Sequence, residues 1–243
     1  TPETMSAGVA AFDFDNDGAP DLLFVNSTLW PWKISPGDTL PTLTLYRNDG
    51  RGRFTDVTTG SGLDVSLYGM GVAIGDYDND SLEDVLITAV GGNRLFRNAG
   101  GGRFRDVTTE AGVGGTTNDW SSSAAWIDYD NDGRLDLFVG QYIRWSREID
   151  FEVDYKLVGL GRAYGPPNNF EGAFPRLCHN DGTGRFTEVS ERSGVQVRNP
   201  ATGVPAAKTL GVAPVDVDGD GWIDLVLAND TVAENNVLSA ILV

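Results

Sequence analysis

The sequence predicts an all-β fold, a β-propeller built from repeated four-stranded antiparallel blades. Two observations support this prediction. A nine-residue acidic motif, first seen as "DFDNDGAPD" at residues 13–21, occurs four times, each time between two short β-rich runs. A glycine-rich block typical of a β-hairpin occurs three times between these copies. Internal repetition with this content is characteristic of propeller architectures.

The first two strands of each blade are predicted on either side of the acidic motif. Small and apolar runs precede it, namely "GVAAF", "GVAIG", "SAAWI" and "GVAPV", and the runs "LLFVN", "VLITAV", "LFVGQY" and "LVLAN" follow it. The small residues suit the innermost strand, where neighbouring blades crowd around the propeller axis. We call the motifs acidic loops one to four; they cover residues 13–21, 76–84, 128–136 and 216–224.

The third and fourth strands are predicted from the glycine-rich block. Its three copies are "LYRNDGRGRFTDVTTGSGL" from Leu45, "LFRNAGGGRFRDVTTEAGV" from Leu95 and "LCHNDGTGRFTEVSERSGV" from Leu177. The Asn-(Asp/Ala)-Gly sequence and the glycine after it indicate a turn with positive φ between two strands. One unit is therefore strand, acidic loop, strand, connection, strand, hairpin turn, strand.

These units divide the chain into about three and a half blades of a single, incomplete propeller spanning residues 1–243. No hairpin block follows the fourth acidic loop, whereas a propeller needs about four blades or more to close. We therefore expect the ring to be completed by further sequence or by another chain. The predicted blades cover residues 6–59, 69–109, 120–190 and 209–243.

Composition restricts the classes of partner. The 243 residues carry a formal net charge of −17, which disfavours nucleic acid and anionic membrane surfaces as partners. The single cysteine, Cys178, excludes an intrachain disulfide. The sequence has no apolar run long enough for a membrane-spanning helix, and its N-terminus lacks the features of a signal peptide.

The acidic loops predict Ca²⁺ sites. Each loop has Asp at positions 1, 3, 5 and 9, and carboxylates about 4 Å apart repel by about 1 kcal/mol even in water. Ca²⁺ takes six to eight oxygen ligands in irregular geometry, which suits alternating aspartates in a tight turn. A solvated acidic turn is the alternative for one copy, but four copies of one spacing argue for metal. Four Ca²⁺ ions would reduce the net charge to −9.

Every loop is predicted to contribute four carboxylates and the backbone carbonyl of its variable position 7. Position 6 is glycine except for Ser81 in loop two, where we expect a strained or weaker site. An EF-hand is excluded because position 12 is apolar and lies in a predicted strand, not a glutamate before a helix. The predicted ligands are Asp13, Asp15, Asp17, Ala19 (carbonyl), Asp21, Asp76, Asp78, Asp80, Leu82 (carbonyl), Asp84, Asp128, Asp130, Asp132, Arg134 (carbonyl), Asp136, Asp216, Asp218, Asp220, Trp222 (carbonyl) and Asp224.

Two insertions between the second and third strands are candidate ligand-contact regions. Blade one carries "STLWPWKISPGDTLPT" and blade three carries residues 142–175, and both are rich in aromatic residues. Long loops on a rigid scaffold often bind ligands, although the insertions could equally pack as lids on their own blades. The candidate contact residues are Trp30, Trp32, Trp145 and Tyr164.

The chain resembles the FG-GAP/VCBS repeats of integrin-α-like propellers, and within them the secreted ASPIC/UnbV, cartilage-acidic-protein-like family. The resemblance rests on "PETMSAGVAAFDFDNDGAPDLLFVN", "NDGRGRFTDVTTGSGL", "GMGVAIGDYDND" and "GVAPVDVDGDGWIDLVLANDT" and covers nearly the whole chain. It implies a seven-bladed propeller in the full-length protein, with Ca²⁺ held in each acidic loop by its four aspartates and the position-7 carbonyl.

The predicted function is a calcium-stabilised extracellular module for adhesion or protein contact, in a secreted, periplasmic or cell-surface protein. A carbohydrate-binding propeller, with aromatic rings stacked on sugars, is the alternative. A Ca²⁺-dependent hydrolase or lyase is a less favoured one. The sole histidine, His179, and Cys178 take positions that other repeats fill with Arg and aromatic residues, so we interpret them as repeat-core residues. As neighbours in a strand they point to opposite faces and cannot readily act as a nucleophile and base pair.

Overall fold

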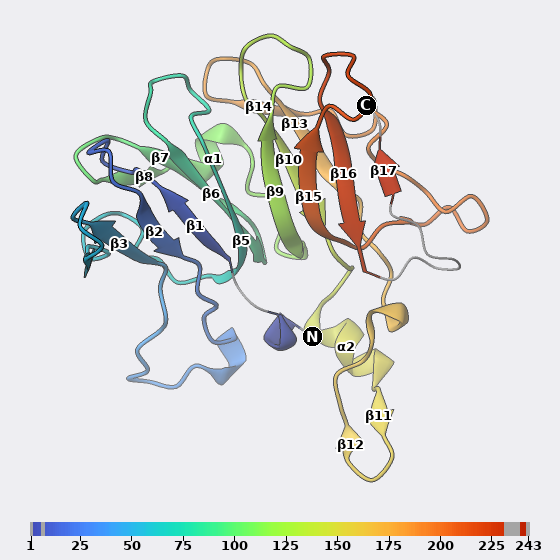
Figure 1. Ribbon diagram of the computed structural model, residues 1–243. Helices are drawn as coiled ribbons and strands as arrows, with labels where there is room; N and C mark the ends of the chain where they lie inside the picture. The colour runs from blue at the N-terminus through green and yellow to red at the C-terminus, as the bar shows by residue number, and fades with distance from the viewer. Residues whose placement is uncertain (1, 6–7, 231–238, 242–243) are drawn as a thin grey trace.

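The computed structural model, which describes residues 2–5, 8–230 and 239–241, has an all-β architecture of antiparallel sheets, as predicted (Figure 1). Three sheets have four strands each, and a fourth sheet has three described strands. In the first three sheets the strands follow one another in chain order from the inner to the outer edge. The strands are β1 (Val9–Phe12), β2 (Asp21–Phe24), β3 (Thr44–Asn48) and β4 (Phe54–Asp56); β5 (Tyr68–Gly75), β6 (Asp84–Val90), β7 (Arg94–Asn98) and β8 (Phe104–Asp106); β9 (Ser121–Ile127), β10 (Asp136–Gln141), β13 (Arg176–Asn180) and β14 (Phe186–Glu188); and β15 (Thr209–Val215), β16 (Asp224–Asn229) and β17 (Ser239–Ile241).

The fourth sheet contains a third strand from the end of the sequence. β17 pairs antiparallel with β16, with Val226 opposite Ala240. The predicted connection between these strands includes residues 231–238, which lie outside the described residues. The blade boundaries and the total number of blades stay predictions.

The first strands of successive sheets lie side by side, as the small residues of these strands predict. β1 contacts β5, β5 contacts β9, and β9 contacts β15. A Cβ atom added to Gly71 in β5 would lie 2.8 Å from the carbonyl oxygen of Ser122 in β9, closer than real side chains allow. Glycine at this position therefore permits the close approach of the two inner strands.

Apolar side chains fill the space between neighbouring sheets. One cluster lies between the first and second sheets and contains Leu23, Leu45, Val85, Ile87 and Phe96, all fully buried. Similar clusters lie between the second and third sheets and between the third and fourth sheets. The bulkier residues of the second and third strands thus hold the blades together.

Several elements were not predicted from the sequence. A one-turn helix, α1 (Thr108–Ala111), follows β8, and short 3₁₀ turns occur at Pro2–Thr4, Pro31–Lys33 and Pro167–Asn169. The insertion at residues 142–175 forms α2 (Arg147–Val153), whose first turn is capped by the Ser146 hydroxyl, and a small hairpin. The hairpin strands are β11 (Lys156–Leu157) and β12 (Gly161–Arg162).

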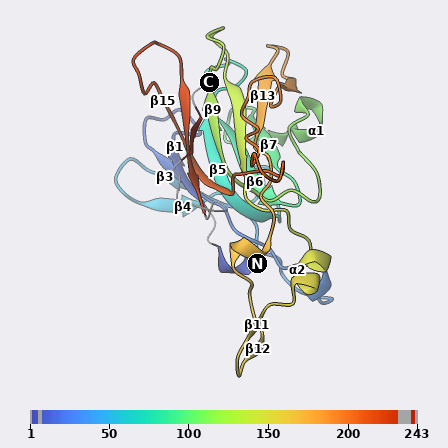
Figure 2. The ribbon, with the colours of Figure 1, turned by 90° about the vertical axis from the view of Figure 1, so that its right-hand side faces the viewer.

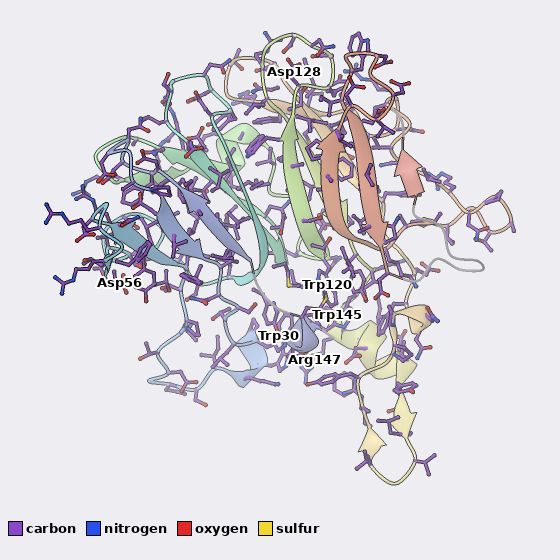
Figure 3. The ribbon with its side chains drawn as sticks, in the orientation of Figure 1. Trp30, Asp56, Trp120, Asp128, Trp145 and Arg147 are labelled. Atoms are coloured by element: carbon purple, nitrogen blue, oxygen red, sulfur yellow. The ribbon has the colours of Figure 1, made fainter. Side chains whose placement is uncertain are left out.

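An aromatic cluster connects the two insertions to the ends of the sheets opposite the acidic loops. It contains Trp30 from the first insertion and Trp145 from the second. Tyr68, the first residue of β5, and Trp120, immediately before β9, also belong to it. Figure 3 shows Trp30, Trp120 and Trp145 gathered below the sheets. Among the described residues, no helix is long and apolar enough to cross a membrane.

Candidate metal sites

The four acidic loops all connect the first and second strands of a sheet, so they gather at the same end of the molecule (Figure 3, where Asp128 is labelled). The figures place both insertions at the other end of the sheets (Figure 1). The antiparallel turn is what brings positions 1 and 9 of each loop together. Asp13 follows the last residue of β1, and Asp21 opens β2 directly opposite Phe12.

The aspartate at position 1 shapes the loop. In loop one, the carboxylate of Asp13 accepts hydrogen bonds from the backbone N–H groups of Asp17 (3.0 Å) and Gly18 (2.8 Å). The same pair of contacts is made by Asp76, Asp128 and Asp216 in the other loops. The position-5 aspartate accepts from the backbone N–H of position 7, as Asp17 does from Ala19 at 3.0 Å. The backbone thus folds around the carboxylates.

The aspartate at position 9 is the most buried member of each loop. Asp21, Asp84 and Asp136 have no exposed surface, and each accepts a hydrogen bond from position 2 of its loop and another from an asparagine N–H on the third strand. Burial, the largest cause, raises the pKa of Asp84 to about 7, and it also raises the pKa values of Asp21 and Asp136. A bound cation would offset the cost of this desolvation, because its positive charge favours the ionised form of the carboxyl.

The aspartate at position 3 leaves one oxygen unpaired in three loops. The Oδ1 atoms of Asp15, Asp78 and Asp130 are buried, yet no described group donates a hydrogen bond to them. Buried polar atoms are nearly always paired, so one orphaned atom at the same position of three loops points to a missing partner. The surrounding donors are carboxylate oxygens, the ligands that hard cations such as Ca²⁺ prefer.

Carboxylate oxygens lie close enough together in all four loops to hold an ion. In each set, one ligand atom from every residue lies within 4.8 Å of the others. The donor set therefore fits Ca²⁺, and three members of each predicted tetrad are brought together in this way. The position-7 carbonyl ligands stay predictions. The sets are Asp13, Asp15 and Asp17; Asp76, Asp78 and Asp84; Asp128, Asp130 and Asp136; and Asp216, Asp218 and Asp224.

Sequence reasoning missed a basic side chain beside the first three loops. Arg47 on β3 pairs with Asp15 (2.8 Å) and Asp17 (3.0 Å), and Arg97 on β7 pairs with the equivalent Asp78 and Asp80. The hydrogen bond that Arg47 donates to Asp17 is the main reason that the pKa of the Asp17 carboxyl is lowered. These cations offset part of the carboxylate repulsion. The available signal was the basic residue immediately before the hairpin asparagine in every glycine-rich block.

His179 occupies the equivalent position on β13, so it lies beside an acidic loop and is not the repeat-core residue that the sequence predicts. Its Nδ1 atom lies 3.3 Å from Asp130 and 3.1 Å from Asp136, so it faces acidic loop three. Cys178 points to the other face and packs in the core between the second and third sheets. Burial raises the pKa of the Cys178 thiol to about 11, which leaves it a poor nucleophile at neutral pH.

A chain of asparagines links successive loops, which the sequence analysis also missed. Position 4 has positive φ in every loop, and asparagine, which tolerates this conformation, holds it in the first three. The Nδ2 group of Asn16 donates to the carbonyl of Ser81 in loop two (3.2 Å), and Asn79 donates to Gly133 in loop three (3.3 Å). The acidic loops are therefore joined in one row. Asn131 continues it with a 3.5 Å contact to the carbonyl of Gly221 in loop four.

The four aromatic candidates in the insertions divide into two pairs. Trp30 and Trp145 are buried in the aromatic cluster, with ring centroids 5.1 Å apart, whereas Trp32 and Tyr164 are about half exposed. A pocket of about 520 Å³ lies between the two insertions and is lined by both buried tryptophans, Trp32 and Arg147. Tyr164 does not line it.

Comparison with protein families finds that the profile described as "FG-GAP-like repeat" matches residues 13–87 and 76–139, together just over half of the chain. The comparison with curated proteins finds no match. One similar solved structure is described as an Agrocybe aegerita lectin that recognises non-reducing terminal N-acetylglucosamine. It has 14% sequence identity and a TM-score of 0.45, covering 92% of this chain and 48% of that one. The chain thus spans about half of that structure, and a likeness this distant carries no argument about ligands.

Proposed function

The chain belongs to the FG-GAP-like repeat family, and on that premise we propose that it is a calcium-stabilised extracellular propeller module that binds a protein partner. The family is generally non-enzymatic. The observation that carries the calcium proposal is the orphaned position-3 oxygen, repeated in three loops of the same construction. Within the family, we propose a place in the ASPIC/UnbV group and a seven-bladed full-length ring, completed by further sequence or another chain.

The proposed role of the metal is structural. Each loop joins two strands of one sheet, and the buried aspartate at position 9 ties the loop to the third strand as well. Calcium, when bound, supplies the positive charge that offsets the remaining carboxylate repulsion. Because the ligands converge only in the folded chain, binding adds to the free energy of unfolding. Extracellular modules bind Ca²⁺ at about 10⁻⁴–10⁻³ M, and we propose an affinity in this range for the acidic loops.

Thermal unfolding tests this proposal directly. Purified protein is melted with excess EDTA, then with millimolar CaCl₂ or MgCl₂. We expect CaCl₂ to raise the midpoint substantially and MgCl₂ to raise it less, because Mg²⁺ demands a stricter octahedral geometry. Equal midpoints in EDTA and CaCl₂ would contradict the proposal.

The variant Asp78→Asn sharpens the test, because its effect should change sign with the metal. In EDTA it removes a carboxylate whose burial and acidic neighbours outweigh its pairing with Arg97, as its raised pKa indicates, so the midpoint should rise or stay unchanged. In CaCl₂ it removes a ligand and should lower the midpoint. Asp64→Asn, an exposed acid outside the loops, is the matched control and should behave alike in both conditions. A destabilisation of Asp78→Asn that is equal in both buffers would argue for a purely structural carboxylate.

An enzymatic role finds little support in the available side chains. The thiol of Cys178 is buried and protonated, His179 faces the carboxylates of loop three, and the two point to opposite faces. The remaining conspicuous carboxylates are those of the metal loops. We therefore propose binding, not turnover, as the activity.

Carbohydrate binding is the second candidate, favoured by the pocket between the insertions. Trp32 lines this pocket with about half of its surface exposed, and it stacks on Trp30 at 5.0 Å with an angle of 6° between the rings. Aromatic rings of this kind can stack on sugars. The test is a glycan array with the wild type and Trp32→Ala. Trp145→Ala is unsuitable, because Trp145 is buried and its loss would disturb the core.

The control for the array is Tyr164→Ala, which removes an exposed aromatic ring outside the pocket. Binding of a defined glycan that Trp32→Ala abolishes and Tyr164→Ala preserves would favour the carbohydrate module. An array without hits would leave the protein-contact proposal as the preferred one.

A further inference from the structure

The β11–β12 hairpin ends in an exposed apolar tip that no described contact explains. Val158 is fully exposed, Leu160 is 80% exposed and Leu157 is 43% exposed. Exposed aliphatic side chains gathered on one projection are uncommon, and they mark interaction sites when they occur. The hairpin reaches well beyond the sheets in both views (Figures 1 and 2). We call residues 157–160 the hairpin tip.

The turn of the tip is closed by its own backbone. The N–H of Leu160 donates to the carbonyl of Leu157 at 3.1 Å, and Leu157 pairs with Gly161 across the two strands. Gly159 has a φ of 83°, a conformation that glycine adopts without strain. This hydrogen bond pairs one backbone N–H with one carbonyl, so neither group is left without a partner in an apolar environment.

Cationic and aromatic side chains lie behind the tip. Lys156 and Arg162 face each other across the hairpin, and they are paired with Asp154 (2.5 Å) and Asp150 (2.7 Å) respectively. The Arg162 guanidinium lies 4.0 Å from the ring centroid of Phe151, which is half exposed. Tyr164, also half exposed, follows. Aliphatic residues at the end with basic and aromatic residues behind them are the order found at membrane–water interfaces.

The strong negative charge of the chain does not oppose such a contact. The sixteen aspartates of the acidic loops lie at the end of the sheets away from the hairpin (Figure 1). Residues 156–164 contain two basic residues and no acid. The acids beside the tip, Asp150 and Asp154, are paired with its two basic residues, so their charge is offset locally.

We propose that the hairpin tip inserts into the interface of a zwitterionic lipid bilayer and docks the molecule reversibly on it. Leu157, Val158 and Leu160 enter the acyl boundary, and Lys156 and Arg162 stay at the headgroups. The tip extends two residues past Lys156, about 7 Å at the rise of a strand, which matches the depth of interfacial segments. Hot spots for protein partners are enriched in Trp, Tyr and Arg and poor in Leu and Val, so the aliphatic tip suits lipid better.

The experiment is flotation of the whole chain with phosphatidylcholine vesicles in CaCl₂ buffer. We expect the wild type to float with the vesicles at roughly millimolar lipid, and binding to change little when NaCl is raised several-fold, because burial drives it. The double variant Val158→Asp, Leu160→Asp should reduce the bound fraction about tenfold or more. Val197→Asp, at an exposed position in the connection from β14 to β15, is the matched control and should bind like the wild type.

Both tip positions are exposed, so these variants should keep the wild-type unfolding midpoint in CaCl₂, which confirms that folding is intact. Vesicle binding lost only in the tip variant supports the proposal. Absence of wild-type binding overturns it, as expected for a tip that fits a protein pocket. Equal binding by the wild type and the tip variant overturns it as well. These vesicle-binding results do not depend on whether the acidic loops hold structural calcium. A failure of the calcium proposal would appear instead as equal unfolding midpoints in EDTA and in CaCl₂.

Discussion

The backbone at Ser81 is the clearest local departure from the repeat. Position 6 of the acidic loops has φ values between 69° and 90°, and three loops place glycine there, whereas loop two places Ser81. A left-handed conformation costs a residue with a Cβ atom about 1–2 kcal/mol relative to glycine. Sequence reasoning expected strain at this position, and the positive φ agrees with that expectation.

Ser81→Gly should therefore stabilise the protein. The expected gain in the free energy of unfolding is about 0.5–1 kcal/mol, because the greater freedom of glycine in the unfolded chain offsets part of the relief. Urea unfolding in saturating CaCl₂ measures it. The reciprocal change Gly133→Ser in loop three should destabilise by a similar amount. A loss of stability in Ser81→Gly, or a gain in Gly133→Ser, would contradict the strain argument.

Cys178 gives a second prediction at the residue scale. The thiol is buried and its pKa is raised to about 11, so it stays protonated in the folded state at pH 8. An aromatic disulfide reagent should react slowly with native protein and fast after unfolding in urea, where the pKa returns to about 8.5. The measurement is the rate of thiol release with and without denaturant. Full reaction of the native protein within seconds would show an accessible thiolate.

At the scale of elements, an asparagine at the end of the third strand links neighbouring sheets in two of the three four-stranded sheets. The Nδ2 group of Asn98 donates to the carbonyl of Phe14 in loop one (2.9 Å) and to that of Glu83 (3.3 Å), and the residue is buried. Asn180 repeats this arrangement between the second and third sheets. Asn48 donates only within its own sheet, to Pro20.

Asn98→Ala should cost about 1–3 kcal/mol, because it leaves buried carbonyl oxygens without a donor. Asn48→Ala, the matched control on the first sheet, should cost less, since its side chain makes no contact with a neighbouring sheet and its hydrogen bond is exposed. Urea unfolding of the two variants in CaCl₂ measures the difference. Equal losses would mean that the inter-sheet hydrogen bond contributes little.

The regular elements were predictable because each blade repeats its own local signals. The alternation of a small-residue strand, an acidic loop and a β-rich run predicted β1 and β2 and their counterparts, and the Asn-(Asp/Ala)-Gly turns predicted the hairpins. The asparagine chain from Asn16 to Ser81 was not predictable, because it joins residues 65 apart whose proximity depends on the packing of two sheets. Arg47 and its equivalents were missed although a basic residue precedes the hairpin asparagine in every block, because their ion pairs depend on how the third strand lies beside the acidic loop of its own sheet.

The insertions lacked such signals. Residues 142–175 occur once, so no second copy distinguishes structural from variable positions. Helix α2 depends on the Ser146 cap and on contacts of Ile149 and Val153 with the aromatic cluster. The burial of Trp30 and Trp145 likewise results from the meeting of two distant insertions. Local pattern therefore predicted the blades, and tertiary contacts decided the rest.

At the scale of the whole molecule, the outer face of the first sheet differs from its equivalents. Phe24 and Phe54 are 39% and 42% exposed, whereas their counterparts on the second sheet, Ile87 and Phe104, are buried against the first sheet. The side chains are apolar in both cases. We propose that the face of the first sheet is covered in the same way by a further blade, either from additional sequence or from another copy of the chain.

This proposal predicts the behaviour of the chain of 243 residues alone. The uncovered face should bind a fluorescent apolar dye and promote concentration-dependent association, because burial of apolar area drives both. The double variant Phe24→Ser, Phe54→Ser should reduce both signals while leaving the unfolding midpoint nearly unchanged, since neither ring is buried. Light scattering after size exclusion, together with dye titration, measures the effect. Phe104→Ser should behave differently and lower the midpoint, because the same ring position lies in the core between sheets. A monomeric wild type without dye binding would show that this face is stable in water and needs no covering blade.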